Sequence, residues 1–195
     1  MFTQNYIKFR RMMFVTGQAS LSASMVSANG TSFTAYPHRG GIADVGGWMA
    51  RGRCQTINEI YTGTTPQNST YFGVFFGTDS TPATKNDYCL GSPITSGLSI
   101  TNGANTPYTE EEEGVYSFYA IFTVKNTTDS DINIYEIGTF TPVSTASGFK
   151  ATASSDTYYA ALMERTVLTE PITIPAGESK LVTYKLTFNQ TLNVE

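Results

Sequence analysis

The stretch that decides the fold runs from Ala161 to Phe188, ALMERTVLTEPITIPAGESKLVTYKLTF. Its last part alternates apolar with polar residues, at the period of two expected for a half-buried antiparallel strand, and the apolar set is Val182, Tyr184, Leu186 and Phe188. Before it, Pro175 fixes φ and Gly177 tolerates positive φ, so the chain can reverse direction after residues 172–174. We therefore expect this stretch to form the closing hairpin of a β-sandwich.

Further apolar alternations, bounded by turn residues, predict strands along the rest of the chain. Asn29-Gly30 lies between two β-compatible runs and predicts a hairpin. The segment 132–140, INIYEIGTF, follows a turn after 115–124 and is the expected antiparallel partner of that strand. The expected class is mainly β, an antiparallel sandwich of immunoglobulin-like or jelly-roll-like type over residues 18–195, with strands near 22–28, 31–36, 56–61, 71–76, 98–101, 115–125, 132–140, 158–163, 172–174 and 181–190.

An N-terminal stripe of apolar residues predicts a short helix. Phe2, Tyr6, Phe9 and Met13 recur at spacings of three and four residues, and Gly17 is a plausible end. We expect residues 1–17 to form a helical arm, which either packs under an edge of its own sheet or docks on a neighbouring subunit. A single further helical turn is expected near Pro82, capped by a preceding hydroxyl residue.

Composition and charge bound the function. The chain has 195 residues and a net charge of −4 at pH 7, which argues against nucleic acid as a main partner, because phosphate binding needs a basic surface. No apolar run approaches the length of a membrane helix, so membrane insertion is not expected. Cys54 and Cys89 match no zinc spacing, and two free thiols are favoured over a single bridge.

Candidate chemistry is sparse. His38 is the single histidine, and no nucleophile motif accompanies it, so we expect no enzyme, no catalytic residues, no cofactor and no metal. The acidic run Glu110 to Glu113 lacks the spacing of a calcium site and is expected to be a solvated loop. Glu136 and Glu164 fall on core strands without the surroundings of a sugar site. Glu136 is in line with apolar neighbours and should be a buried acid, hydrogen-bonded by backbone N–H groups, Tyr or Arg.

The segment 37–53 is rich in glycine and cannot form a regular strand. It lacks the Gly-Lys-Ser/Thr ending of a phosphate-binding loop, so an irregular surface excursion is expected. Trp48 in this segment would anchor a partner if it is exposed.

Three blocks in the chain carry a specific resemblance. They are FFGTDSTPATKNDYCL at 75–90, VYSFYAIFTVKNTT with INIYEIGTF at 115–140, and ALMERTVLTEPITIPAGESKLVTYKLTF at 161–188. Together, and in this order, they resemble a group of small structural proteins of tailed bacteriophages. Those proteins carry a "GTGTTP…DDY" turn, an "I-x-E-I-G-L-F" strand and an "ARTVL…PITIPAGES…VTYTL" hairpin. Thr139 stands where the group often has Leu, and 37–53 matches nothing in the group.

The resemblance implies a non-enzymatic virion protein, made in the host bacterial cytoplasm, that is a multi-copy subunit of the tail, baseplate or neck. Its partners would be copies of itself and other virion structural proteins. The alternatives are a module that binds a host receptor or surface glycan, and a capsid decoration protein. The residues expected at assembly contacts are Phe2, Tyr6, Phe9, Met13 and Trp48.

Overall fold

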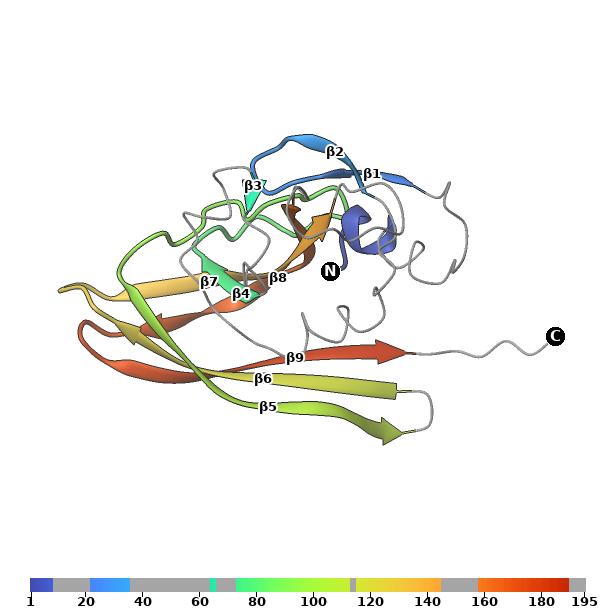
Figure 1. The fold of residues 1–195 in the computed structure, drawn as a ribbon. Coiled ribbons are helices and arrows are strands. Elements are labelled where there is room, and N and C mark those ends of the chain that lie inside the picture. The colour runs from blue at the N-terminus through green and yellow to red at the C-terminus, as the bar shows by residue number, and fades with distance from the viewer. Residues whose placement is uncertain (9–21, 36–63, 66–72, 113–114, 145–157, 190–195) are drawn as a thin grey trace.

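The computed structural model describes residues 1–8, 22–35, 64–65, 73–112, 115–144 and 158–189 (Figure 1). This part of the chain is mainly β, with one short helix at residues 4–8. Its strands are β1 (Ala23–Val26), β2 (Ser32–Ala35), β3 (Thr64–Thr65), β4 (Gly73–Gly77), β5 (Leu98–Glu112), β6 (Val115–Asn126), β7 (Ile132–Ser144), β8 (Tyr158–Ile174) and β9 (Ser179–Asn189). The expected fold class, an antiparallel β-sandwich, agrees with this architecture.

Two antiparallel sheets form the layers. The first has the order β3-β8-β7-β4, and the second has the order β5-β6-β9. They appear in Figure 1 as an upper and a lower layer, with the β1–β2 hairpin above the first. The hairpin was expected from Asn29-Gly30, and Gly30 has the positive φ of 83° that such a turn favours.

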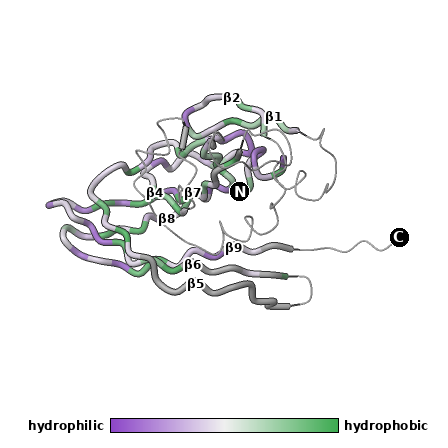
Figure 2. The backbone as a smooth tube through the Cα atoms, viewed as in Figure 1, coloured by the Kyte–Doolittle hydropathy of each residue, from purple (hydrophilic) through white to green (hydrophobic). Residues whose placement is uncertain are grey.

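The main core lies between the two sheets. Phe122 and Val124 of β6 are fully buried and belong to the same cluster as Ile134 of β7 and Met163 of β8. Figure 2 shows the apolar stretches on β4, β7 and β8. The opposite face of the first sheet is also covered, by a smaller cluster of Ala28, Phe75, Leu90, Phe140, Ala160 and Leu162. A sheet buried on both faces explains why residues 160–163, AALM, are apolar without alternation.

Two expected hairpins are wrong, because their turns pass from one sheet to the other. β6 pairs with β5 and β9, whereas β7 pairs with β4 and β8, so the 127–131 turn does not join partners. The 175–178 turn likewise connects β8 of the first sheet to β9 of the second. Gly177 does take the expected positive φ, 72°.

A buried asparagine holds this corner of the sandwich together. The Asn126 side-chain amide donates to the backbone carbonyls of Ser130 at 2.7 Å and Ile174 at 2.9 Å. The backbone N–H of Asn126 donates to the backbone oxygen of Glu178 at 2.9 Å. Asn126 is fully buried, so these bonds replace water at both sheet-to-sheet turns. Sequence reasoning missed this residue, although Asn at a strand end before Thr-Thr-Asp is itself a turn signal.

Several other expected strands, loops and turns differ from those in the structure. The acidic run was expected to be a solvated loop, but Glu110–Glu112 belong to β5, whose pairing with β6 extends to Glu112. The expected strands 158–163 and 172–174 are one strand, β8. No helical turn forms near Pro82, because the side chains of Asp79 and Asp87 organise that loop instead. The expected strand 56–61 lies outside the described residues.

The N-terminal segment lies against its own sheet. Phe2 bridges to Glu164 of β8, Thr3 N donates to Met163 O at 3.0 Å, and Tyr6 is buried in the main core. Asn5 exchanges two hydrogen bonds with the backbone of Val26. Of the two placements weighed for the arm, the described part therefore follows the first. These contacts hold the segment on its own sandwich, and a role in assembly stays a prediction.

Candidate functional site

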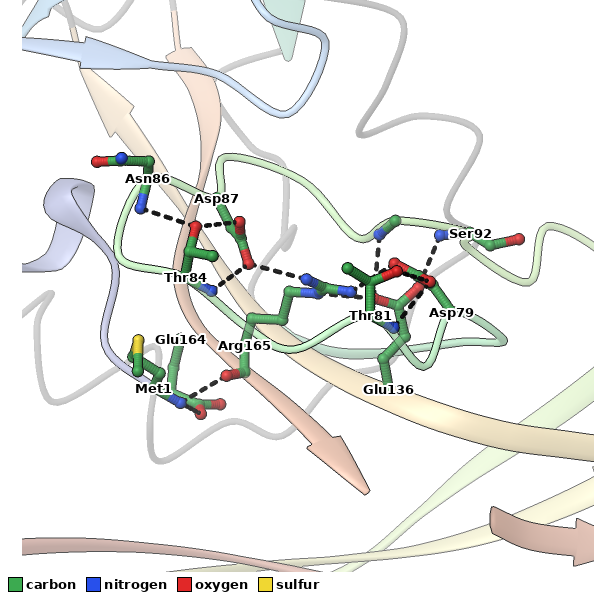
Figure 3. A network of polar contacts seen from close by, with 11 residues as sticks. Met1, Asp79, Thr81, Thr84, Asn86, Asp87, Ser92, Glu136, Glu164 and Arg165 are labelled. Atoms are coloured by element: carbon green, nitrogen blue, oxygen red, sulfur yellow. Dashed lines mark hydrogen bonds and ion pairs between the residues drawn. The ribbon is translucent and has the colours of Figure 1, made fainter. Parts of the chain in front are cut away.

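The candidate site is a buried arginine that joins three carboxylates (Figure 3). Arg165 follows the apolar core of β8, and its side chain is 4% exposed. Its Nε donates to Glu136 Oε2 at 2.8 Å. Nη1 donates to Asp87 Oδ2 at 2.9 Å and Nη2 donates to Asp79 Oδ2 at 2.8 Å. One side chain thus connects β8, β7 and the loop that follows β4.

Glu136 is fully buried, as its position in the strand predicts. Besides Arg165, it accepts hydrogen bonds from two backbone N–H groups, Gly91 to Oε2 at 3.0 Å and Ser92 to Oε1 at 2.8 Å. Both of its oxygens therefore have N–H partners, which offsets the cost of burying the charge. These two hydrogen bonds attach the end of the loop at Gly91 and Ser92 to β7.

Asp79 and Asp87 each hold a part of the loop after β4 in a local turn. Asp79 Oδ1 accepts from the N–H of Thr81 at 3.0 Å and from its hydroxyl at 2.8 Å. Asp87 accepts from the N–H of Thr84 at 2.9 Å and from its hydroxyl at 2.6 Å. Each is a local turn in which a side chain substitutes for a backbone acceptor. These turns orient Asp79 Oδ2 and Asp87 Oδ2 toward Arg165, and Asp87 Oδ2 accepts from both Thr84 N–H and the guanidinium.

Two glycines make room for the carboxylates. A Cβ on Gly77 would lie 2.2 Å from Glu136 Oε1, and a Cβ on Gly91 would lie 1.8 Å from Asp79 Oδ2. Neither distance is possible for a real side chain, so the cluster requires glycine at both positions. Gly138 makes room in the same way for Leu90 of the smaller apolar cluster, since a Cβ there would lie 2.7 Å from the Leu90 side chain.

A second polar group lies on the neighbouring residue of β8. The Met1 ammonium group donates to Glu164 Oε1 at 2.6 Å and to the backbone oxygen of Arg165 at 2.5 Å. Thr166 donates to Glu164 Oε1 at 2.5 Å, and Tyr184 of β9 donates to Glu164 Oε2. The last bond links the two sheets through the core. Glu136 and Glu164, considered from sequence as a carboxylate pair, thus have separate cationic partners.

Electrostatics agree with this geometry. Hydrogen bonds from Thr81 and the charge of Arg165 hold the pKa of Asp79 below its usual value. Burial raises the pKa of Asp87, but hydrogen bonds from Thr84 and Arg165 outweigh it and the net pKa is lowered. Burial and the charge of Glu164 raise the pKa of Tyr184 well above its usual value. At neutral pH both aspartates are therefore ionised and Tyr184 keeps its proton.

This arrangement is suited to fixing a loop. All three nitrogens of the guanidinium are paired, and each carboxylate has additional donors, so the cluster is saturated. In the described ranges no group of three His, Cys, Asp or Glu side chains could hold a metal ion. The loop's outer side chains, Ser80, Thr81, Thr84, Lys85, Asn86 and Tyr88, are exposed. The cluster therefore presents a polar loop in one conformation.

Of the other predicted site residues, the structure describes Phe2 and Tyr6, which lie outside this cluster. Phe2 and Tyr6 stack on each other with ring centroids 4.2 Å apart. Phe9, Met13 and Trp48 lie outside the described residues, as do His38 and Cys54. Cys89 is a half-buried free thiol next to the cluster, and burial and the nearby Glu136 raise its pKa. Sequence reasoning missed Arg165, although an arginine directly after an apolar strand is a signal for a buried ion pair.

Comparison with known proteins gives no relative: no family model, curated protein or solved structure matches the chain. Within the described part of the chain, no helix is long and apolar enough to cross a membrane.

Proposed function

We propose that this chain is a non-enzymatic structural protein of a tailed bacteriophage virion, present in multiple copies in the tail, baseplate or neck. The observation that supports it most directly is where the residues of the resemblance lie. Asp79 and Asp87 come from the first block, Glu136 from the second and Arg165 from the third, and all four form one buried cluster. Asp87, Glu136 and Arg165 match the group's motifs, whereas Asp79 stands where GTGTTP has glycine. That matching residues from three separate blocks interact supports the resemblance.

The physical properties of the site support the same role. A saturated ion network fixes the 78–92 loop without leaving an unpaired reactive group among its members. A subunit that repeats one contact many times needs loops of defined shape, because each contact is small and conformational freedom lowers its affinity. A rigid polar loop on a sandwich meets that need.

The test is to purify particles from cells that produce this chain and to quantify the chain in them by mass spectrometry. We expect a copy number that is a multiple of the symmetry order of a ring in the particle. We also expect an image reconstruction to locate the chain in the tail, baseplate or neck. Absence from purified particles would contradict the proposal. An outward-projecting position with binding to purified host envelope would favour the receptor- or glycan-binding alternative, and a regular array on the head would favour decoration.

A further inference from the structure

The edges of the two sheets differ in how they are covered. The outer edge of β4 is paired with the chain that follows it, since Thr78 N donates to Ser92 O at 2.8 Å and Ile94 N to Phe76 O at 2.9 Å. The outer edge of β8 is covered as far as Arg165 by β3, by Ala28 and by the N-terminal segment. Beyond it, β8 carries Pro171 within an irregularity in its pairing with β7. The first sheet therefore offers no long regular edge.

The second sheet has two long edges, and one of them is poorly suited to pairing. β5 shows three shifts of register against β6 and contains Pro107 and the acidic residues Glu110–Glu112. Bulges, proline and charge on an edge strand are the usual means of preventing another strand from adding to it. β5 is in this sense a protected edge.

β9 has fewer of these protections, since it has no bulge or proline and its charged residues are Lys180 and Lys185. Its eleven residues pair with β6 without a register shift, and it contains no glycine or proline. In the described part of the chain it pairs along one edge alone. Leu181 is 69% exposed, the highest value among the large apolar side chains described as exposed, and Thr183 beside it is exposed as well. A long, regular and partly apolar edge is a template for strand addition.

We infer that the outer edge of β9, which no described strand covers, is the contact through which two copies of this chain pair, with their β9 strands antiparallel. This inference deepens the proposed function and rests on it for a second copy as the partner. It joins the two three-stranded sheets into one six-stranded sheet, while the cores of both sandwiches stay as they are. The contact is isologous, so each residue i that meets j is matched by j meeting i.

The sequence of β9 is compatible with itself in this arrangement. Full overlap places Tyr184 on the two-fold axis, Leu181 opposite Thr187, and Thr183 opposite Lys185. The two lysines of the strand, Lys180 and Lys185, never face each other, because residues on opposite faces cannot be partners across an antiparallel pair. The pairing thus buries Leu181 without opposing like charges.

This register makes a charge-dependent prediction. Thr183→Lys places a lysine opposite Lys185 of the partner copy at two symmetric positions and so creates two like-charge pairs, whereas Thr183→Glu creates two opposite-charge pairs. Cross-strand pairs of this kind predict a rise of about 2- to 30-fold in dimer Kd for the lysine variant and a fall of similar size for the glutamate variant. Thr123→Lys is the matched control, because Thr123 is exposed on the same sheet but on the inner strand β6.

Sedimentation equilibrium of the full chain and the three variants measures these constants, with thermal melts to show that each variant is folded. We expect a reversible dimer that weakens with Thr183→Lys, tightens with Thr183→Glu and is unchanged with Thr123→Lys. A monomeric chain, equal effects of both Thr183 variants, or an equal effect of the control overturns the inference. A chain found in particles that stays monomeric overturns this inference alone, whereas a chain that dimerises but is absent from particles overturns the proposed virion role.

Discussion

Replacing Arg165 by methionine tests whether the buried cluster stabilises the fold. Methionine keeps much of the side-chain volume but removes three charged hydrogen bonds. Asp79 and Asp87 keep their threonine donors and are 25% and 18% exposed, so water can replace part of what they lose. Glu136 is 0% exposed and would be left with two backbone donors alone. The penalty therefore falls mainly on Glu136.

Leaving one member of a buried ion pair without its partner costs roughly 3–5 kcal/mol. For a chain of this size, each kcal/mol lowers Tm by about 2–4 °C, so Arg165→Met should lower Tm by roughly 6–20 °C. The assay is urea denaturation followed by far-ultraviolet circular dichroism, together with a thermal melt. Lys125→Met, which removes an exposed cation on β6, is the control and should change stability by less than about 0.5 kcal/mol.

A double-mutant cycle separates pairing from packing. In Glu136→Gln the arginine keeps both aspartates, and the double variant Arg165→Met/Glu136→Gln contains no unpaired buried charge. We expect the double variant to be more stable than the sum of the single effects predicts, by about 1–3 kcal/mol. An Arg165→Met variant that loses less than about 1 kcal/mol, or effects that add within about 0.5 kcal/mol, would refute this reasoning.

Four further predictions use the same denaturation assay. Gly91→Ala should cost roughly 1–3 kcal/mol, because its Cβ would lie 1.8 Å from Asp79 Oδ2; unchanged stability would mean that the loop can move away. Hydrogen bonds lower the pKa of Asp79, and at Asp87 they outweigh the effect of burial. The stabilisation from both carboxylates is therefore complete above their ordinary pKa of 3.8 and declines as pH falls below it. A free energy of unfolding that does not change with pH below 3.8 would contradict this. Asn126→Ala should cost roughly 1–3 kcal/mol, because the buried Ile174 carbonyl and the part-buried Ser130 carbonyl lose their donor, and a loss below about 1 kcal/mol would show that water replaces it. The raised pKa of Tyr184 predicts that stability falls as pH rises above 10.0, and that Tyr184→Phe removes this alkaline loss; the same loss in the variant would assign it to other groups.

Local sequence signals predicted most strands because their causes are local. Period-two alternation identified β6 and β9, and buried and exposed side chains alternate over residues 122–126 of β6 and 181–185 of β9. Positive φ at Gly30 and Gly177 follows from the turn residues beside them. The burial of Glu136 was also predictable, because its strand position fixes the face on which it points.

The sequence alone thus determined most of the extended segments and turns that the structure describes, and the burial of Glu136. It did not determine which strands pair, because a short turn can close a hairpin within one sheet or carry the chain to the opposite sheet. That choice depends on side chains far along the chain, such as Asn126, which bonds to Ile174 across the corner. Arg165 reaches partners 29, 78 and 86 residues away, and no local pattern encodes such distances. Only the tertiary structure brings these groups together, because the cost of burying each charge is offset by partners that the fold itself supplies.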